Sequence, residues 1–286
     1  MNIRSTPETN RQDLDWEDGL MVAVGQFASV ADTRENVARI EGLTARAAAA
    51  GARLIAFPEA ASYAFSTGGP ELGDIARQES GLFREEMARI ALKHEIALIV
   101  GMYDDGGGAL SDNVLLALGP DGALCGRYHK LHLYDAFTFR ESEKNTIAQL
   151  QPDFAELVTI DIGPFRFGLV NCYDLRFPEM ARALVQRGAN VLVVCAGWIA
   201  GPLKELHWEL LLRARAIENT SYVIAASQPA PLSAGLSMAV DPSGLVLGTV
   251  AETEGIALAR LSLSHLTDFR RILPCLEQRR YHVVQG

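Results

Sequence analysis

The stretch that decides the fold runs from residue 165 to residue 179 and reads FRFGLVNCYDLRFPE. Residues 165–170 have the length and the apolar composition, rich in Phe and Val, of a buried strand. Pro178 and Glu179 suit the first turn of a helix, where the missing N–H of proline does no harm and a carboxylate is favourable. The stretch therefore predicts that Cys172 lies on a turn between a strand and a helix.

A thiol on such a turn can face a cleft, and the N–H groups at the helix terminus would lower its pKa. The alternative is a small buried cysteine that only fills the core. The position of Cys172 does not distinguish these two interpretations, so the rest of the chain has to decide.

The composition limits the classes of protein to which the chain can belong. With 286 residues, of which 49% are hydrophobic, it can form one large α/β domain or two small ones. The net charge of −9 and the absence of a Lys or Arg run argue against nucleic acid and anionic membranes as partners. No apolar stretch reaches about 18 residues, so no membrane-spanning segment is expected.

The four cysteines, at positions 125, 172, 195 and 275, lack the paired spacing of a metal site. The sequence also lacks a phosphate-binding glycine loop, so we expect no metal and no organic cofactor. The cysteine pattern is typical of a reduced, cytoplasmic chain rather than a disulfide framework. Residues 1–18 are polar, lack the apolar core of a signal peptide and are expected to form a flexible tail.

Short apolar strands alternate with amphipathic helices along the chain. Strands are expected at 20–27, 53–58, 96–104, 113–119, 123–128, 157–163, 165–171, 190–197, 221–228, 235–241 and 255–261. Helices are expected at 32–50, 80–94, 178–188, 203–219 and 263–273, and hairpin turns at 119–122 and 241–244. Helices separate some strands and tight turns join others, which predicts mixed sheets in a four-layer α-β-β-α sandwich. We expect a single domain over residues 19–275 and a C-terminal extension over 276–286.

Chemically competent side chains follow several of the expected strands. Glu59 comes directly after a buried strand and a proline, where an unpaired carboxylate would be costly. Lys130 follows the strand 123–128, and Glu141 follows Lys130 at a distance of eleven residues. Each of these residues alone is typical of a solvated surface or loop. Together with Cys172 they form a set that could assemble where strand ends meet.

This set is suited to nucleophilic catalysis. A Cys172 thiolate can attack an acyl carbon, and Glu59 can act as its base. Lys130 can stabilise the oxyanion, assisted by the backbone N–H of Tyr173. His129 and His132 flank the lysine and are expected to make structural hydrogen bonds rather than to act as the base.

Three segments resemble the signature segments of the nitrilase, or carbon–nitrogen hydrolase, superfamily. They are FPEA at 57–60, HKLHL at 129–133 and CYDLRFPE at 172–179. The resemblance covers residues 20–262. It implies the superfamily's four-layer fold, its Glu-Lys-Cys triad at Glu59, Lys130 and Cys172, and its second active-site glutamate at Glu141.

Within the superfamily the sequence is most similar to the branch of ω-amidases and deaminated-glutathione amidases. Members of this branch have a longer loop, with Pro and Gly, where this chain has YDAFTFRES at 134–142. The resemblance implies hydrolysis of small amides to ammonia and a carboxylic acid, with an ω-amide of a dicarboxylic acid as one candidate. It also implies a homodimer or larger homo-oligomer, with helices near 178–188 and 203–219 at the interface.

Further residues are candidates for the pocket and the core. Tyr63, Tyr173 and Trp198 are expected to contact substrate. Arg176 can bind a substrate carboxylate, but Asp174 and Glu179 favour a structural ion pair. Two cysteines in strands, Cys125 and Cys195, are expected to be inert core residues.

Three functional hypotheses remain open. The first is an amidase that uses a thioester. The second is an acyl transferase, or a nitrile or carbamoyl hydrolase, that uses the same Glu-Lys-Cys site. The third is a non-catalytic scaffold, against which the complete set of four reactive residues argues.

Overall fold

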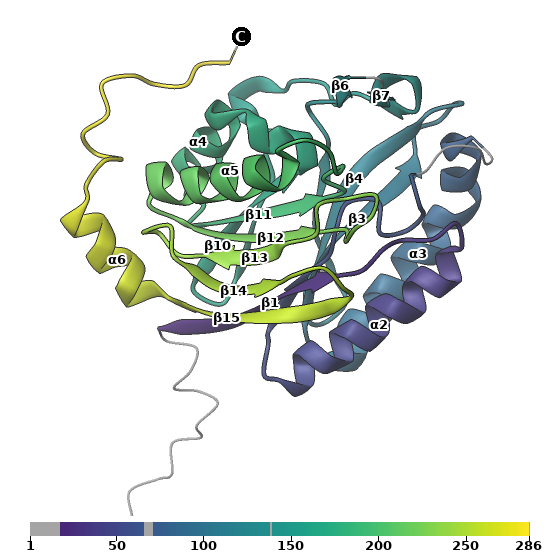
Figure 1. Ribbon diagram of the computed structural model, residues 1–286, viewed down its shortest axis with the longest axis horizontal. Helices are drawn as coiled ribbons and strands as arrows, with labels where there is room; N and C mark the ends of the chain where they lie inside the picture. The colour runs from purple at the N-terminus through teal and green to yellow at the C-terminus, as the bar shows by residue number, and fades with distance from the viewer. Residues whose placement is uncertain (1–17, 66–70, 138, 286) are drawn as a thin grey trace, which may run out of the picture.

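Two β-sheets pack face to face between two pairs of helices (Figure 1). This computed structural model describes residues 18–65, 71–137 and 139–285. The expected four-layer α-β-β-α sandwich is confirmed. The tail expected at residues 1–18 lies, except for Asp18, outside the described residues.

The first sheet is parallel at its centre and antiparallel toward its edges. Its strand order is β15 (Gly255–Ser262), β1 (Gly19–Gln26), β2 (Leu54–Ala56), β3 (Ala97–Asp105), β4 (Ser111–Leu118) and β5 (Leu124–His129), and β8 (Asn145–Thr146) also pairs with β4. Helices α2 (Thr33–Ala49) and α3 (Leu72–His94) cover its outer face.

The second sheet repeats this plan. Its strand order is β14 (Val246–Val250), β13 (Ser237–Val240), β12 (Tyr222–Ser227), β11 (Val191–Ala196), β10 (Phe165–Asn171) and β9 (Thr159–Ile162). Strands β10, β11 and β12 are parallel, because helices α4 (Pro178–Gln186) and α5 (Lys204–Asn219) connect them. The carboxyl ends of the parallel strands therefore lie at one edge of each sheet.

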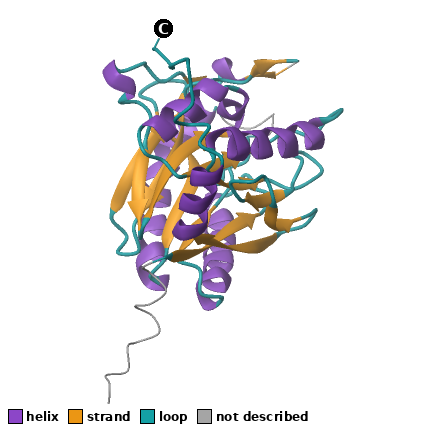
Figure 2. Cartoon of the chain, turned by 90° about the vertical axis from the view of Figure 1, so that its left-hand side faces the viewer, coloured by secondary structure: helices purple, strands orange, loops and turns teal. Residues whose placement is uncertain are grey.

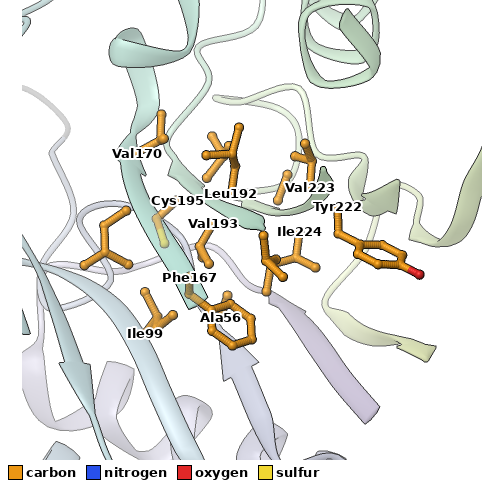
Figure 3. Packing of buried hydrophobic residues seen from close by; sticks show 14 of the residues in the cluster. Ala56, Ile99, Phe167, Val170, Leu192, Val193, Cys195, Tyr222, Val223 and Ile224 are labelled. Atoms are coloured by element: carbon orange, nitrogen blue, oxygen red, sulfur yellow. The ribbon is translucent and has the colours of Figure 1, made fainter. Parts of the chain in front are cut away.

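The core follows the alternation of side chains along the strands. Ala56 and Ile99 from the first sheet lie close to Phe167 and Val193 from the second (Figure 3). Ile55 lies between Leu54 and Ala56, whose side chains face the second sheet, and its own side chain packs on the opposite face, in the cluster beneath α2 and α3. Each sheet is therefore buried on both faces, which explains why its central strands read as continuous apolar runs.

Several elements differ from the sequence-based prediction, and the two-residue strands β6 (Asp135–Ala136), β7 (Phe139–Arg140) and β8 are among those not expected. Helix α3 begins at Leu72 rather than at residue 80, because its first turns bury the small residues Gly73, Ala76 and Ser80, which give little apolar periodicity. Strand β14 was not expected. Its residues alternate between half-buried and exposed positions, so it lacks the apolar signal of a buried strand.

The chain ends in helix α6 (Leu263–Ile272) and a loop that runs along the outside of the molecule (Figure 2). Residues 274–285 form no helix or strand, and Gln285 donates a hydrogen bond to the carbonyl of Gln151. Within the described ranges, no helix is long and apolar enough to cross a membrane.

Candidate active site

The four residues expected to carry the chemistry come together at the carboxyl ends of the strands. Glu59 follows β2, and Lys130 follows β5. Cys172 is the first residue of a short 3-10 helix (Cys172–Arg176) that continues directly from β10. These three residues and the fourth, Glu141, line one pocket of about 570 Å³ that is partly open to solvent.

Lys130 is the centre of this group. Its Nζ donates hydrogen bonds to Glu59 Oε1 at 2.7 Å and to Glu141 Oε1 and Oε2 at 2.9 and 2.8 Å. All three side chains are buried. An ammonium between two carboxylates satisfies charges that would be costly if they were buried alone.

The turn that carries Glu59 packs closely against the backbone of β3 in the first sheet. Gly101 of β3 lies under this turn, where a Cβ atom would come within 2.5 Å of the Glu59 Cα and 2.7 Å of the Pro58 carbonyl. Only glycine leaves room for the turn at this position. The backbone of Gly101 accepts from Ala61 N–H at 2.9 Å and thereby holds the turn.

Cys172 occupies an unusual backbone conformation, with φ of +50°. A non-glycine residue rarely adopts this conformation, and such residues concentrate at functional sites. Asp174 holds the turn, because its carboxylate accepts from Asn171 N–H at 3.1 Å, from Tyr128 Oη at 2.7 Å and from His132 N–H at 3.0 Å. The expected structural role of His132 agrees with this contact.

Aromatic side chains form much of the pocket wall. They are Phe65, Tyr103, Tyr134, Phe139, Tyr173 and Trp198. Tyr173 and Trp198 line the pocket, and their expected contact with substrate stays a prediction. Tyr63 is not among the described residues that line the pocket, and it packs instead on a small cluster with Ala60, Ala76 and Tyr103.

Arg176 lines the pocket, and its guanidinium carbon lies 4.6 Å from the centre of the Trp198 ring. The ion pair favoured for it is not found: among described residues, Asp174 instead binds His132 and Tyr128, and no salt bridge involves Arg176. A guanidinium stacked on an indole remains free to bind an anion in the pocket.

The sequence from residue 21 to residue 271 matches the carbon–nitrogen hydrolase family model. The chain belongs to the carbon–nitrogen hydrolase family. This carbon–nitrogen hydrolase is therefore an enzyme that hydrolyses carbon–nitrogen bonds.

Relatives and solved structures agree with this assignment. The deaminated glutathione amidase of Escherichia coli O157:H7 is 33% identical over 92% of this chain and 98% of its own length. The crystal structure of the C. elegans NitFhit protein is 31% identical, with a TM-score of 0.84, over 92% of this chain; the hydrolase spans 65% of that longer chain. An amidase variant from Nesterenkonia sp. AN1 is 25% identical, with a TM-score of 0.76, over 89% of this chain and 98% of its own, and carries acrylamide added at its active-site cysteine.

The electrostatics of the hydrolase site correct one expectation about the thiol. Burial and the neighbouring Glu59 carboxylate raise the pKa of Cys172 well above its ordinary value, although Lys130 acts in the opposite direction. Burial alone would raise the pKa of Glu59, but the charge and hydrogen bond of Lys130 lower it overall. These shifts favour a protonated Cys172 beside an ionised Glu59, so the expectation that the helix terminus lowers the pKa of the thiol is wrong.

Several groups of the hydrolase site were not predicted. Asn113 Nδ2 donates to Glu59 Oε1 at 2.8 Å and to Glu141 Oε1 at 2.9 Å, and Gly197 N–H donates to Glu59 Oε2 at 2.9 Å. Tyr134 N–H donates to Glu141 Oε2 at 2.7 Å. The polar Asn113 at the start of an apolar run could have been recognised in the sequence as a site residue. The backbone N–H donors could not, because they do not depend on residue type.

Two cysteines outside the site have different environments. Cys195 is buried in β11, as expected, and burial raises the pKa of its thiol. Cys125 lies in β5 but is exposed, so the expectation of a core residue is wrong. It lies on a strand in which only Tyr128 is fully buried.

Proposed function

We propose that this enzyme is an amidase that hydrolyses the ω-amide of a small dicarboxylic acid through a thioester on Cys172. The products are ammonia and the dicarboxylic acid. The observation that carries the proposal is the convergence of a thiol, Glu59, Lys130 and Glu141 in one pocket.

Acylation begins with the protonated thiol. As the Cys172 sulfur bonds to the amide carbon, the Glu59 carboxylate accepts the thiol proton. The carbonyl oxygen becomes an oxyanion, which Lys130 and the backbone N–H of Tyr173 stabilise. The C–N bond then breaks, and Glu59 returns the proton to the departing nitrogen so that ammonia leaves as a neutral molecule.

Deacylation uses the same groups in reverse roles. A water molecule attacks the thioester carbon while Glu59 accepts its proton. The C–S bond breaks, the proton returns to the sulfur of Cys172, and the carboxylic acid is released. No cofactor enters either step.

Glu141 supports this chemistry from the other side of the lysine. Its two oxygens hold the Lys130 ammonium, while Asn113 fixes one of them relative to Glu59. One carboxylate oxygen of Glu141 can also accept from the amide nitrogen of the substrate. This orientation would favour amides over esters, which have no N–H to donate.

The unpaired guanidinium of Arg176 supports an acyl chain that ends in a carboxylate. The name of the E. coli relative, deaminated glutathione amidase, supports amide hydrolysis as the reaction. Tyr173 and Trp198 are proposed to contact the acyl chain between the reactive carbon and this carboxylate.

The proposal includes a homodimer. Helix α5 exposes Leu206, Leu210 and Ile217, whose spacing places them on one helix face. Helix α4 buries its apolar residues within the subunit, so α5 is the better candidate for the contact. A nucleophilic thiol must stay reduced, so the proposed location is the reducing cytoplasm.

The experiment is an ammonia-release assay on ω-amides, aliphatic amides, carbamoyl compounds and nitriles, with wild type and Cys172→Ala. The proposal predicts fastest turnover of ω-amides and none in the variant, while Cys125→Ala serves as an exposed-cysteine control and retains activity. Turnover in Cys172→Ala would reject the mechanism. Transfer of most acyl groups to added hydroxylamine rather than to water would instead favour an acyl transferase.

A further inference from the structure

Lys204 is a buried cation in the pocket that the proposed chemistry does not use. It is the first residue of α5, lines the same pocket as Cys172, and is only 7% exposed. Its backbone carbonyl accepts from Trp198 Nε1 at 2.9 Å, which fixes the start of the helix against the pocket wall.

The ammonium of Lys204 has polar and aromatic neighbours but no carboxylate partner among the described residues. Its Nζ donates to Tyr134 Oη at 2.9 Å and lies 4.8 Å from the centre of the Phe137 ring and 6.0 Å from that of Trp198. Among residues 18–65, 71–137 and 139–285, no salt bridge involves this ammonium. The sequence between these ranges, STGGP at 66–70 and Thr138, contains no acidic residue.

The charges of the pocket do not balance. The two carboxylates that line it, Glu59 and Glu141, are both bound to Lys130. Lys204, Arg176 and Lys144 also line it, and none of them forms a salt bridge within the described part of the chain. A pocket with excess positive charge in a chain of net charge −9 is suited to an anionic ligand.

Lys204 and Arg176 are placed to act together, since both lie against the ring of Trp198. A buried ammonium without a counter-ion is costly, and the rings and one hydroxyl replace only part of its hydration. A carboxylate that entered the pocket could accept charge-assisted hydrogen bonds from both cations.

We propose that Lys204 is a specificity-determining residue that, with the hydroxyl of Tyr134 and with Arg176, binds the carboxylate at the far end of the acyl chain. The inference rests on the proposed function and names the group that selects its substrate. Tyr134 also donates its backbone N–H to Glu141 Oε2, so one residue connects the anion subsite to the reacting centre.

The test compares the monoamide of glutaric acid with pentanamide, which has a methyl group in place of the carboxylate. Removing a charge-assisted hydrogen bond in Lys204→Met should lower the ratio of their kcat/KM values about tenfold or more. Lys204→Arg should retain most of the preference. Lys93→Met, a matched change at an exposed lysine on α3, should leave the ratio unchanged.

Inhibition by glutarate supplies a readout that does not depend on turnover. Its inhibition constant should rise in Lys204→Met by a factor similar to the change in the kcat/KM ratio, while inhibition by pentanamide should change much less. An unchanged ratio in Lys204→Met, or an equal loss on both substrates, would overturn the proposal and leave the lysine a structural support for Tyr134. A loss of kcat/KM in Lys204→Met that is confined to amides whose leaving amine, rather than the acyl chain, carries a carboxylate would also overturn the proposal.

Failure of the proposed function has a different signature. If wild type hydrolyses neither amide, the proposed ω-amide substrate class fails, yet binding of glutarate measured by calorimetry still tests the anion subsite. Weaker glutarate binding in Lys204→Met would then support the subsite, and equal binding would reject it.

Discussion

Lys130 Nζ lies 2.7 Å from Glu59 Oε1, and the two residues are only 1% and 7% exposed. Because burial separates this pair from water, each charge depends on the other. The pair joins the end of β5 to the end of β2 and fixes the protonation state of the base proposed for Cys172. The contact between Lys130 and Glu59 is therefore expected to contribute both to stability and to catalysis.

Replacing Lys130 by Met should damage both properties. Loss of oxyanion stabilisation should slow amide turnover by about a hundredfold or more. The variant also leaves Glu59 and Glu141 buried without a cation, which should lower the free energy of unfolding by about 3 kcal/mol or more. Steady-state kinetics and urea unfolding measure the two effects.

A double variant separates the two effects of this substitution. Lys130→Met combined with Glu141→Gln removes one of the two uncompensated carboxylates, so it should recover part of the stability but none of the activity. If the double variant recovered wild-type turnover, Lys130 would have no direct role in the reaction.

The two glutamates should differ in their dependence on the leaving group. Glu59→Gln should slow amide hydrolysis severely, because proton transfer is needed in acylation and in deacylation. Glu141→Gln should slow amide turnover, yet an activated ester should still acylate Cys172, since an ester has no N–H for Glu141 to orient. Intact mass spectrometry follows the acyl-enzyme. Failure of the Glu141 variant to react with the ester would contradict this division of roles.

The pH profile follows from the directions of the pKa shifts. The pKa of Glu59 lies below its ordinary 4.5, mainly because Lys130 outweighs the effect of burial, so the base stays ionised until the pH falls below that value. The pKa of the Cys172 thiol lies above 9.0, so the proton that Glu59 accepts is present throughout the neutral range. We expect kcat/KM to be constant across the neutral range and to fall only toward acidic and toward strongly basic pH.

A second consequence concerns stability. A carboxylate whose pKa is lowered by folding stabilises the protein above its ordinary pKa, and this contribution is lost as the pH falls through the lowered value.

An inflection in kcat/KM near pH 6.5, the ordinary range of histidine, would show that a histidine rather than Glu59 controls the reaction.

The apolar face of α5 should mediate dimer formation. Leu206 and Leu210 are about half exposed in the subunit, at 49% and 54%. Replacing both by Glu should convert a dimer into a monomer in light scattering at micromolar concentration. Leu92→Glu on α3, with an exposed fraction of 59%, is the control and should leave the dimer intact. A monomeric wild type would refute the proposed assembly.

The activity should not depend on a bound metal. Within the described residues, no group of three or more His, Cys, Asp or Glu side chains is arranged to hold one. Dialysis against a chelator should therefore leave turnover unchanged. Activity lost on dialysis and restored by a divalent cation would contradict the proposed mechanism.

The sequence was sufficient to predict the layers and the gathering of the four reactive residues. The apolar runs and the helix-start residues record burial and capping, which act within a few positions of the chain. Asp32, for example, directly precedes α2 and caps it, because its side chain accepts from Arg34 N–H and Glu35 N–H. Strand ends also follow from such patterns, so Glu59, Lys130 and Cys172 could be placed together.

What the sequence did not provide depends on contacts between distant segments. The raised pKa of the Cys172 thiol arises from burial against Glu59, which no local pattern records. Lys204 reads as a solvated lysine at a helix start, and only the fold brings it against Tyr134. The packing of Tyr63 on the cluster of Ala60, Ala76 and Tyr103 also depends on the fold, since its position in the sequence near Glu59 does not determine which way its side chain packs.

The thioester on Cys172 is measured most directly by rapid-quench intact mass spectrometry of the wild-type enzyme with an activated ester, followed by peptide mapping. The proposed mechanism predicts one acyl group per active subunit, on the peptide that contains Cys172, formed and hydrolysed at rates that match turnover. An acyl group on any other residue, or turnover that proceeds while Cys172 is never acylated, would contradict it.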